Sequence, residues 1–425
     1  MARKVLISFL GTGRTGKDNS SKRQYETTSY KIEDKEYQSS FMADVLIQHL
    51  NIDHVIVIGT LKSMWEELYR VMSDGKTYDE EIALNTGIKI ESFNCKTNVS
   101  KGDIILKMLS QVRNLTPIII NYGINQEEIT NNINKILSID SELKNDDEIF
   151  IDITHSFRSL PLILNSVINY VNEVSKKNIQ IKGVYYGMLE VSNANELGYT
   201  PVVQLNSINM LNEYIKGAYE FQNIGSAYKM SELLKEENKS YSVILEDFSE
   251  SQSLNHIYDL KSQVQKLKSI TADKLTPIQE KVIIPMLNKF LNKFDNAKND
   301  SQFQIELADW MFSHRQYGYS SIILIECIIT KGCEMLRFDA ADRNKREDVK
   351  KIITNSGKIK KNQDEFLKNF SNQQIDELKS FHTLWGNVNV IRKSVAHSIG
   401  IKLSKSKMIK DLEKYIEETK TIIYK

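Results

Sequence analysis

The first half of the chain alternates short runs of β-branched residues with amphipathic stretches, and no other feature limits the fold as strongly. Strands that alternate with helices build a mostly parallel sheet with helices on both faces, a doubly wound Rossmann-like α/β fold. The predicted strands span residues 5–9, 55–58, 88–93, 117–121, 149–153 and 181–186. The predicted helices span residues 39–50, 63–72, 101–112, 127–136 and 160–174, and residues 25–37 resemble a hairpin. Ligands of such sheets bind beyond the carboxyl ends of the strands.

The pattern changes after about residue 207, where long helical segments rich in Lys and Glu replace the strands. Polar residues at 249–253 and 295–301 interrupt the apolar period and are the best candidate breaks. At 425 residues the chain exceeds the size at which one core usually keeps growing. We therefore expect a sheet domain at 1–206, a helical connector at 207–300 and an all-helical domain at 301–425.

The composition is that of an ordinary globular protein, with 41% hydrophobic and 26% charged residues. The formal net charge is +1, so a nucleic-acid contact requires a local basic patch, and a dedicated binder of duplex DNA is not expected. The three cysteines are scattered, which argues against a disulfide framework and a structural zinc site. No segment reaches 18 consecutive apolar residues, so we expect a cytoplasmic protein without membrane contact.

The turn after the first strand reads Gly11-Thr12-Gly13-Arg14-Thr15-Gly16-Lys17-Asp18. It satisfies the dinucleotide pattern GxGxxG, but the following residues lack the apolar face of the helix that this pattern requires. A P-loop needs Ser or Thr where Asp18 stands. A nicotinamide-dependent oxidoreductase is therefore disfavoured. The glycines still permit close approach of a ligand to the backbone. The segment alone leaves a nucleotide-type ligand and a plain tight turn equally open.

A second turn follows the strand predicted at 149–153 and precedes a helix. Its polar and charged residues are Asp152, Thr154, His155, Ser156 and Arg158. A serine that caps the helix and a proline in its first turn are ordinary structural features. They leave His155 and Arg158 without a role. A phosphate-rich ligand at the start of the helix would use both.

Near the C-terminus, Arg392 precedes His397 by five residues in a segment that resembles a helix. Arg is a permanent cation shaped to grip a phosphate, and His exchanges a proton near neutral pH. These two capacities are the minimum for cutting RNA without a metal. A solvated helix face carries the same pair by chance, so this interpretation depends on the rest of the chain.

The motifs together resemble the CRISPR-associated Rossmann-fold (CARF) family. The turn Phe9-Leu10-Gly11-Thr12-Gly13 and the run from Asp152 to Pro161 carry the resemblance, and the Gly59-Thr60 turn and Trp65 also fit. Such proteins usually carry a C-terminal HEPN domain, whose hallmark is Arg, four to six residues, then His. Arg392 and His397 match it, although Lys393 stands where the family commonly has a small polar residue.

The resemblance implies an endoribonuclease, a hydrolase of type III CRISPR antiviral defence, that a cyclic oligoadenylate switches on allosterically. We expect a ring of four adenylates, with six as the alternative. The expected nucleotide-binding contacts are Thr12, Gly13, Thr60, Thr154, His155, Phe157 and Arg158. A ring with two-fold symmetry is best read by a symmetric assembly, so a homodimer or a higher even oligomer is expected.

The same resemblance places RNA cleavage at Arg392 and His397. On an ideal helix these residues lie about 140° apart, so they do not share a face within one chain. We therefore expect a composite site at a dimer interface that cuts single-stranded RNA by attack of the 2′-hydroxyl and needs no metal or other cofactor. Arg392 would neutralise the scissile phosphate and His397 would move the proton. Asn389 and Ser394 would orient the pair.

Two alternatives stay open at this point. The chain could be a nucleotide-regulated binding or toxin-antitoxin protein with a CARF-like sensor that cuts nothing. The CARF domain could also cleave its own activator slowly near Thr12 or Thr154, which the sequence neither supports nor excludes.

Overall fold

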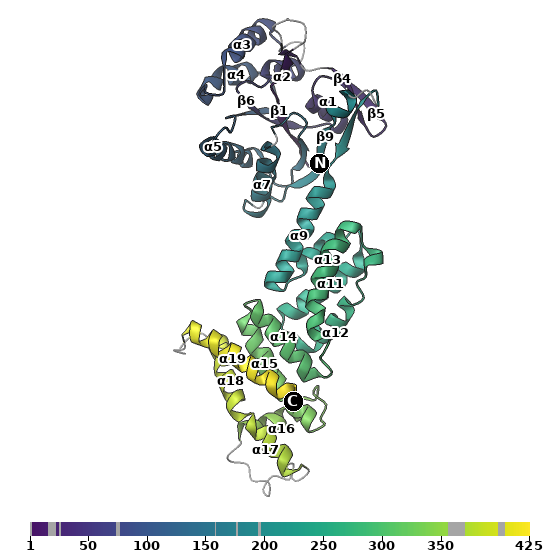
Figure 1. Cartoon of the computed structure of the whole chain (residues 1–425), viewed down its shortest axis with the longest axis vertical. Helices are drawn as coiled ribbons and strands as arrows, with labels where there is room; N and C mark the ends of the chain where they lie inside the picture. Colours follow the sequence, from purple (N-terminus) through teal and green to yellow (C-terminus); the bar gives the residue numbers. More distant parts are fainter. Residues whose placement is uncertain are drawn as a thin grey trace. The chain divides into compact units, whose positions relative to one another are not determined.

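The computed structural model describes residues 2–15, 23–24, 27–73, 77–157, 159–175, 177–193, 197–355, 370–397 and 404–425. The chain splits into two compact units, Met1–Ile208 and Asn209–Lys425 (Figure 1). The first is built around a sheet and the second is helical. The predicted class, a Rossmann-like sheet domain followed by a helical region, is confirmed.

The sheet of the first unit has eight strands in the order β5-β4-β10-β9-β8-β1-β6-β7. Its parallel part comprises β1 (Lys4–Leu10), β6 (His54–Thr60), β7 (Leu115–Ile120), β8 (Glu148–Asp152) and β9 (Gln180–Gly187). Three more strands extend it beyond β9, namely β10 (Thr200–Gln204), β4 (Thr28–Ile32) and β5 (Lys35–Ser39). A separate ribbon pairs β2 (Arg14–Thr15) with β3 (Arg23–Gln24).

The strand order reverses at β1. From β1 the chain builds outward through β6 to β7 on one side, and it later returns to build β8 and β9 on the other. In doubly wound sheets this reversal is the topological switch point, where the connections that leave adjacent strands diverge and open a crevice. The switch point lies beyond Leu10 at the end of β1 and Asp152 at the end of β8.

Helices cover both faces of the sheet, as the alternation predicts. Val5, Ile7 and Phe9 of β1 join the core on one face, while Leu6 and Leu10 join the core on the other. The face of Leu6 is covered by α1 (Met42–Leu50), α2 (Trp65–Met72), α3 (Glu80–Ser92) and α4 (Asp103–Leu109). The opposite face is covered by α5 (Gln126–Leu137), α6 (Ile139–Glu142) and α7 (Leu160–Glu173). The short elements η1 (Val99–Gly102) and α8 (Leu189–Asn193) complete the unit.

One predicted strand is wrong, because residues 88–93 lie mostly in α3. The side chain of Asp79 accepts a hydrogen bond from the backbone N of Ile82 at 3.0 Å and caps this helix. Ala83, Thr86 and Ile90 then lie buried at helical spacing. The predicted hairpin is present as β4 and β5, whereas β10 was not foreseen.

The second unit is built from helices around one apolar core. Its first part comprises α9 (Asn206–Ile224), α10 (Tyr228–Leu234), α11 (Lys239–Ser253), α12 (Ile257–Leu267), η2 (Ala272–Lys274), α13 (Pro277–Leu291) and η3 (Asn292–Phe294). Its second part comprises α14 (Asp300–Ser313), α15 (Tyr317–Met335), α16 (Arg343–Thr354), α17 (Asn372–Ser380), α18 (His382–Ala396) and α19 (Lys405–Ile423). The core helix expected near 317–336 is confirmed as α15, which packs against α14, α16, α18 and α19. The break expected at 249–253 is wrong, because these residues end α11.

Within the part of the chain that the structure describes, no helix is long and apolar enough to cross a membrane.

Candidate functional site

Most of the side chains expected to touch a ligand follow the carboxyl ends of three adjacent strands, β6, β1 and β8. Thr60 ends β6, Thr12 and Gly13 follow β1, and Thr154 and His155 follow β8. The register places Ser8 of β1 opposite Asp152 of β8. The two turns singled out in the sequence therefore flank the switch point. Their contact with a ligand stays a prediction.

Asp152 is the buried anchor of the turn that follows β8. Its carboxylate accepts a hydrogen bond from the Ser8 hydroxyl at 2.7 Å and another from the backbone N of Thr154 at 2.9 Å. The hydroxyl of Thr154 in turn accepts a hydrogen bond from the backbone N of Gly187 at 2.9 Å. These bonds connect β1, β8 and β9, so the backbone of the turn is held in one conformation before any ligand binds.

Tyr30 of the β4–β5 hairpin lies fully buried beside this cluster. A Cβ added at Gly187 would lie 3.0 Å from its ring and 3.3 Å from the Thr154 side chain, so all three residues pack closely. Burial raises the pKa of Tyr30, and the Asp152 carboxylate raises it further. The hairpin therefore packs directly on the turn after β8.

The turn after β1 is held by the turn after β6. The backbone N of Met64 donates to the Gly11 carbonyl at 3.0 Å, and the Ser63 hydroxyl donates to the Leu10 carbonyl at 2.6 Å. Gly13 has φ +68°, and a Cβ there would lie 2.0 Å from the Met64 sulfur. Only glycine fits this position without strain. Thr12 is half-buried.

Thr60 is the least accessible member of the predicted set, with 1% of its surface exposed. Its backbone N donates to the Ser63 hydroxyl at 2.9 Å, and its carbonyl accepts from the Trp65 indole at 2.7 Å. In this structure Thr60 therefore stabilises the turn after β6 through its backbone hydrogen bonds.

His155 is half-buried and stacks on Phe41, with ring centroids 5.8 Å apart and planes inclined by 24°. Burial lowers the pKa of His155, and the Asp152 carboxylate opposes this shift. Phe157 is 41% exposed, and its ring centroid lies 6.1 Å from that of Tyr122. Arg158 lies outside the described residues. The His155 ring and the exposed Phe157 ring therefore both belong to the turn that follows β8.

The predicted catalytic residues lie at the C-terminal end of α18. Arg392 is half-buried, and its Nε donates to the Asn389 side-chain oxygen at 3.2 Å. This bond places Asn389 beside Arg392, and a catalytic role for either residue stays a prediction. The Ser394 hydroxyl donates to the Val390 carbonyl of its own helix at 2.8 Å. Asn389 thus holds the guanidinium, while the Ser394 proton is used within the helix.

His397 does not lie on the helix as expected. The helix ends at Ala396, and His397 caps it with φ −121° and ψ 68°. Its backbone N still donates to the Lys393 carbonyl at 2.8 Å, and its side chain is exposed. The angle of about 140° predicted for an ideal helix does not apply to a residue that leaves the helix. The imidazole instead projects from the end of α18 into solvent.

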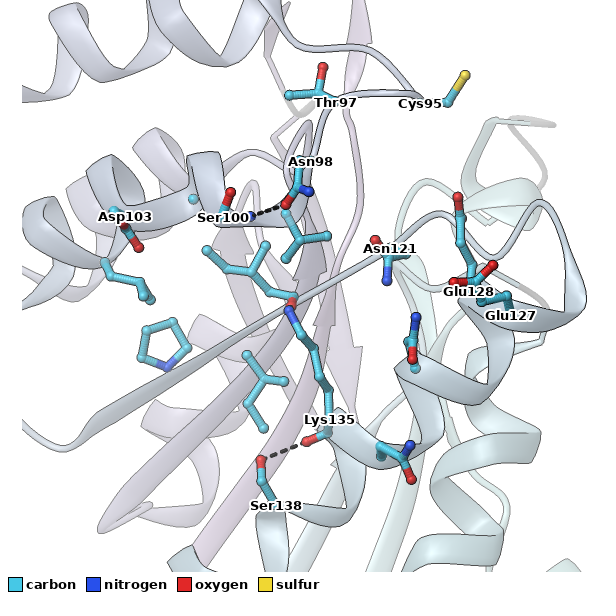
Figure 2. A pocket seen from close by; sticks show the side chains of 18 of the residues that line it. Cys95, Thr97, Asn98, Ser100, Asp103, Asn121, Glu127, Glu128, Lys135 and Ser138 are labelled. Atoms are coloured by element: carbon cyan, nitrogen blue, oxygen red, sulfur yellow. Dashed lines mark hydrogen bonds between the residues drawn. The ribbon is translucent and has the colours of Figure 1, made fainter.

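A polar pocket of about 1030 Å³ lies elsewhere, along the outer side of the edge strand β7 (Figure 2). The backbone N of Val55 donates to the Asn114 carbonyl, so Thr116 and Ile118 also face β6 by alternation. Pro117 and Ile119 therefore face outward. Pro117 has no N–H, and the Ile119 carbonyl accepts a hydrogen bond from the Lys135 ammonium at 2.7 Å. Burial lowers the pKa of Lys135. The floor of the pocket is thus a strand edge on which Pro117 offers no N–H and the Ile119 carbonyl is already hydrogen-bonded.

Sequence reasoning missed the residues that support the switch point, above all Ser8, Ser63 and Met64. Their positions relative to the turns depend on strand pairing and carry no local signal. Among the described residues, no group of three or more His, Cys, Asp and Glu side chains is placed to hold a metal ion.

Comparison with protein families gives two matches. Residues 5–190 match the model described as the CARF domain of CRISPR system endoribonuclease Csx1. Residues 210–301 match the second domain of CRISPR-associated protein MJ1674. The first unit is therefore similar to a CARF domain of CRISPR-associated proteins, which confirms the CARF part of the resemblance read from the two turns. Neither of these two models covers residues 302–425, so the HEPN assignment stays a prediction.

Among curated proteins, the chain is similar to CRISPR-associated protein MJ1674 of Methanocaldococcus jannaschii, with 37% identity over 375 residues. The alignment covers 84% of this chain and 58% of that protein, so the chain spans less than two thirds of its relative. Among solved structures, Enterococcus italicus Csm6 bound to cyclic hexa-2'-fluoro-hexa-dAMP has a TM-score of 0.41 at 11% identity. This match covers 99% of this chain and 93% of that chain. A likeness at this level supports no inference about function.

Proposed function

We propose that the chain is a metal-independent endoribonuclease of type III CRISPR defence that a cyclic oligoadenylate activates. The observation that carries the proposal is the match of residues 5–190 to the Csx1 CARF domain. The predicted ligand residues of that segment flank the switch point, which is where sheets of this class bind ligands. The alternative, a regulated binding protein that cuts nothing, shares the sensor and differs only in the helical unit.

The switch point between β1 and β8 suits an anionic ring with splayed bases. Gly13 allows phosphates to approach the backbone closely, and Thr12 and Thr154 bring hydroxyl groups beside it. The exposed ring of Phe157 offers a face on which a base stacks. We expect Arg158 to pair with a phosphate. Four adenylates remain the expected ring size, with six as the alternative.

The end of α18 suits RNA cleavage without a metal. Asn389 restrains the Arg392 guanidinium, which would neutralise the charge that develops on the scissile phosphate. The exposed His397 imidazole would move a proton to or from the ribose hydroxyl or the leaving oxygen. Attack by the 2′-hydroxyl leaves a 2′,3′-cyclic phosphate on the product.

The two activities are proposed to belong to separate segments of the chain. The match of residues 210–301 to a second-domain model supports a connector at 207–300 between a CARF domain at 1–206 and a HEPN domain at 301–425. Residues 295–299 join η3 to α14 without helical structure, close to that boundary. Activation would be a population shift, in which the ring binds more tightly to the arrangement that sets the paired catalytic helices.

Two substitutions test the catalytic part. Purified Arg392→Ala and His397→Ala are incubated with labelled single-stranded RNA and activator in EDTA. We expect each to lower the cleavage rate by at least about 100-fold, because positioned acid-base groups contribute about 10²–10⁴ in rate. Lys414→Ala removes an exposed cation of α19 and should cleave at the parent rate.

The melting temperature and the solution mass of every variant should equal those of the parent. Full cleavage by both Arg392→Ala and His397→Ala would overturn the enzyme proposal and favour the binding protein. Cleavage that returns only with added Mg²⁺ would overturn the metal-free scheme.

A further inference from the structure

The hydroxyl of Tyr30 is a buried polar group that this structure does not use. The side chain is fully buried, and among the described residues its hydroxyl has no hydrogen-bond partner. Nearly all buried polar groups in folded proteins are paired, because an unpaired one keeps the full cost of leaving water. Phenylalanine would fill the same space without that cost. Packing alone therefore gives no reason for a hydroxyl at this position.

The sheet, and not the hydroxyl, sets the position of Tyr30. Its backbone pairs with Tyr37 across the β4–β5 hairpin and with Thr200 of β10. The hydroxyls of Thr28 and Thr200 lie 2.8 Å apart and connect the same two strands. The ring belongs to the apolar core on the face of the sheet that α1 covers. A substitution that removes only the hydroxyl therefore leaves the ring in place.

The Asp152 carboxylate is a neighbouring acceptor for the Tyr30 proton. Burial raises the pKa of Tyr30, and Asp152 is close enough to raise it further. One oxygen of Asp152 accepts from the Ser8 hydroxyl and the other from the backbone N of Thr154. A carboxylate oxygen can accept more than one hydrogen bond, so Asp152 has capacity for a further donor.

A ligand at the switch point would act on the same carboxylate. Thr154, whose backbone N donates to Asp152, is one of the residues expected to contact the ring. The next residue, His155, stacks on Phe41, which follows strand β5 of the hairpin. A ligand that moves this turn therefore moves both the Asp152 carboxylate and the contacts of the turn with the hairpin segment.

We propose that Tyr30 is a positioning residue for the activator: a bound cyclic oligoadenylate turns the Asp152 carboxylate toward Tyr30, whose hydroxyl then donates a hydrogen bond to it. The inference rests on the proposed function, because the activator is what moves the turn. The bond belongs to the bound arrangement alone, so it adds to the affinity for the ring and not to the stability of the chain without a ring. It also ties the β4–β5 hairpin to the turn that carries Thr154 and His155.

The test compares Tyr30→Phe with the parent in the full chain. Binding of cyclic tetra-adenylate and of cyclic hexa-adenylate is measured by isothermal titration calorimetry without RNA, and the melting temperature is measured without a ring. Tyr30→Phe should bind the ring at least about tenfold more weakly, because a hydrogen bond to a charged group is lost from the bound arrangement. Its melting temperature without a ring should equal or exceed that of the parent.

Tyr185→Phe is the matched control. Tyr185 is also a buried tyrosine of this sheet, on β9, and its hydroxyl accepts a hydrogen bond from the Gln204 amide at 2.9 Å. The loss of this bond should lower the melting temperature and leave the affinity for the ring unchanged. A purely structural role of Tyr30 would give the same result as this control.

Equal affinities of the parent and Tyr30→Phe for the ring would overturn the inference. So would a fall in melting temperature as large as that of Tyr185→Phe, because the Tyr30 hydroxyl would then be paired without a ring. A parent chain that binds neither ring would overturn the proposed sensor and this inference with it. Ring binding that follows the prediction in a chain that cleaves no RNA would leave the role of Tyr30 standing and overturn the proposed nuclease instead.

Discussion

Asp152 organises the candidate ligand site without needing to touch a ligand. Its two oxygens accept hydrogen bonds from a neighbouring strand and from the turn that carries Thr154 and His155. A buried acceptor of this kind sets where the backbone amides of the turn lie. The Asp of the sequence signature is therefore explained by the architecture of the switch point, whatever the ligand is.

We predict that Asp152→Ala destabilises the first unit. The change leaves the buried Ser8 hydroxyl and the Thr154 N–H without their acceptor, at a cost of about 1–3 kcal/mol for each group. Asp152→Asn keeps an acceptor oxygen and should lose much less. Urea unfolding at neutral pH measures both, and affinity for the ring should fall in the same order. Equal stability of the parent and both variants would contradict this role.

The low pKa of His155 predicts a pH dependence of stability. Because burial lowers its pKa, the unfolded chain takes up a proton on this residue at a higher pH than the folded chain does. Stability should therefore fall as the pH drops below the ordinary histidine value of 6.5. His54, whose pKa is also lowered by burial, acts in the same direction.

The melting temperature of His155→Gln should decline less than that of the parent between about pH 7.5 and 5.5. This window lies above the range in which carboxylates take up protons. His54→Gln is the matched comparison. An identical decline in the parent and in His155→Gln would show that His155 titrates normally in the folded protein.

Among the elements, β7 lies at one edge of the sheet. Edge strands invite pairing with other chains, and proline and lysine are common means of preventing it. Here Pro117 removes one outward N–H, and Lys135 occupies the outward carbonyl of Ile119. Figure 2 shows the Lys135 side chain reaching across the pocket toward the strand.

We predict that the double variant Pro117→Val, Lys135→Met associates into larger species than the parent does. Valine restores an outward N–H, and methionine frees the carbonyl while keeping the length of the side chain. Light scattering across a concentration series measures the change. Lys107→Met, an exposed position on α4, should leave the mass unaltered. If the double variant keeps the mass of the parent, these two residues do not protect the edge.

The sequence predicted elements best where the local pattern and the tertiary environment agree. Strands β1, β6, β7, β8 and β9 are continuous apolar runs because both faces of the sheet are covered. A strand was wrongly predicted at residues 88–93 because Ile88 and Ile90 alternate with polar residues. The acidic first turn after Asp79 indicates a helix instead. Strand β10 is short and contains Pro201, so its pairing with β9 decides its structure.

In the candidate site, too, only the residues with a local sequence signal could be predicted. The two turns carry local signals in glycine and in the Asp-Ile-Thr-His run, so they were predictable. The bond from Ser8 to Asp152 joins residues 144 positions apart, and no local pattern reveals it. The end of α18 at Ala396 was also not predictable, because Val395 and Ala396 are compatible with a longer helix.

For the whole molecule, the two activities that we propose would lie in separate compact units. The sensor is supported by a family match and by the architecture of the switch point. The nuclease is supported by the Arg392 and His397 pair at the end of α18. The evidence for the sensor does not require a nuclease, and the evidence for the nuclease does not require a sensor. Control of the nuclease by the sensor therefore needs its own test.

The most direct test is the rate at which the purified full chain cuts a labelled single-stranded RNA in EDTA, with and without rings of three, four and six adenylates. We predict that one ring, expected to be the tetra-adenylate, raises the rate at least about 100-fold and that the products end in a 2′,3′-cyclic phosphate. Equal rates with every ring and with none would contradict the central claim.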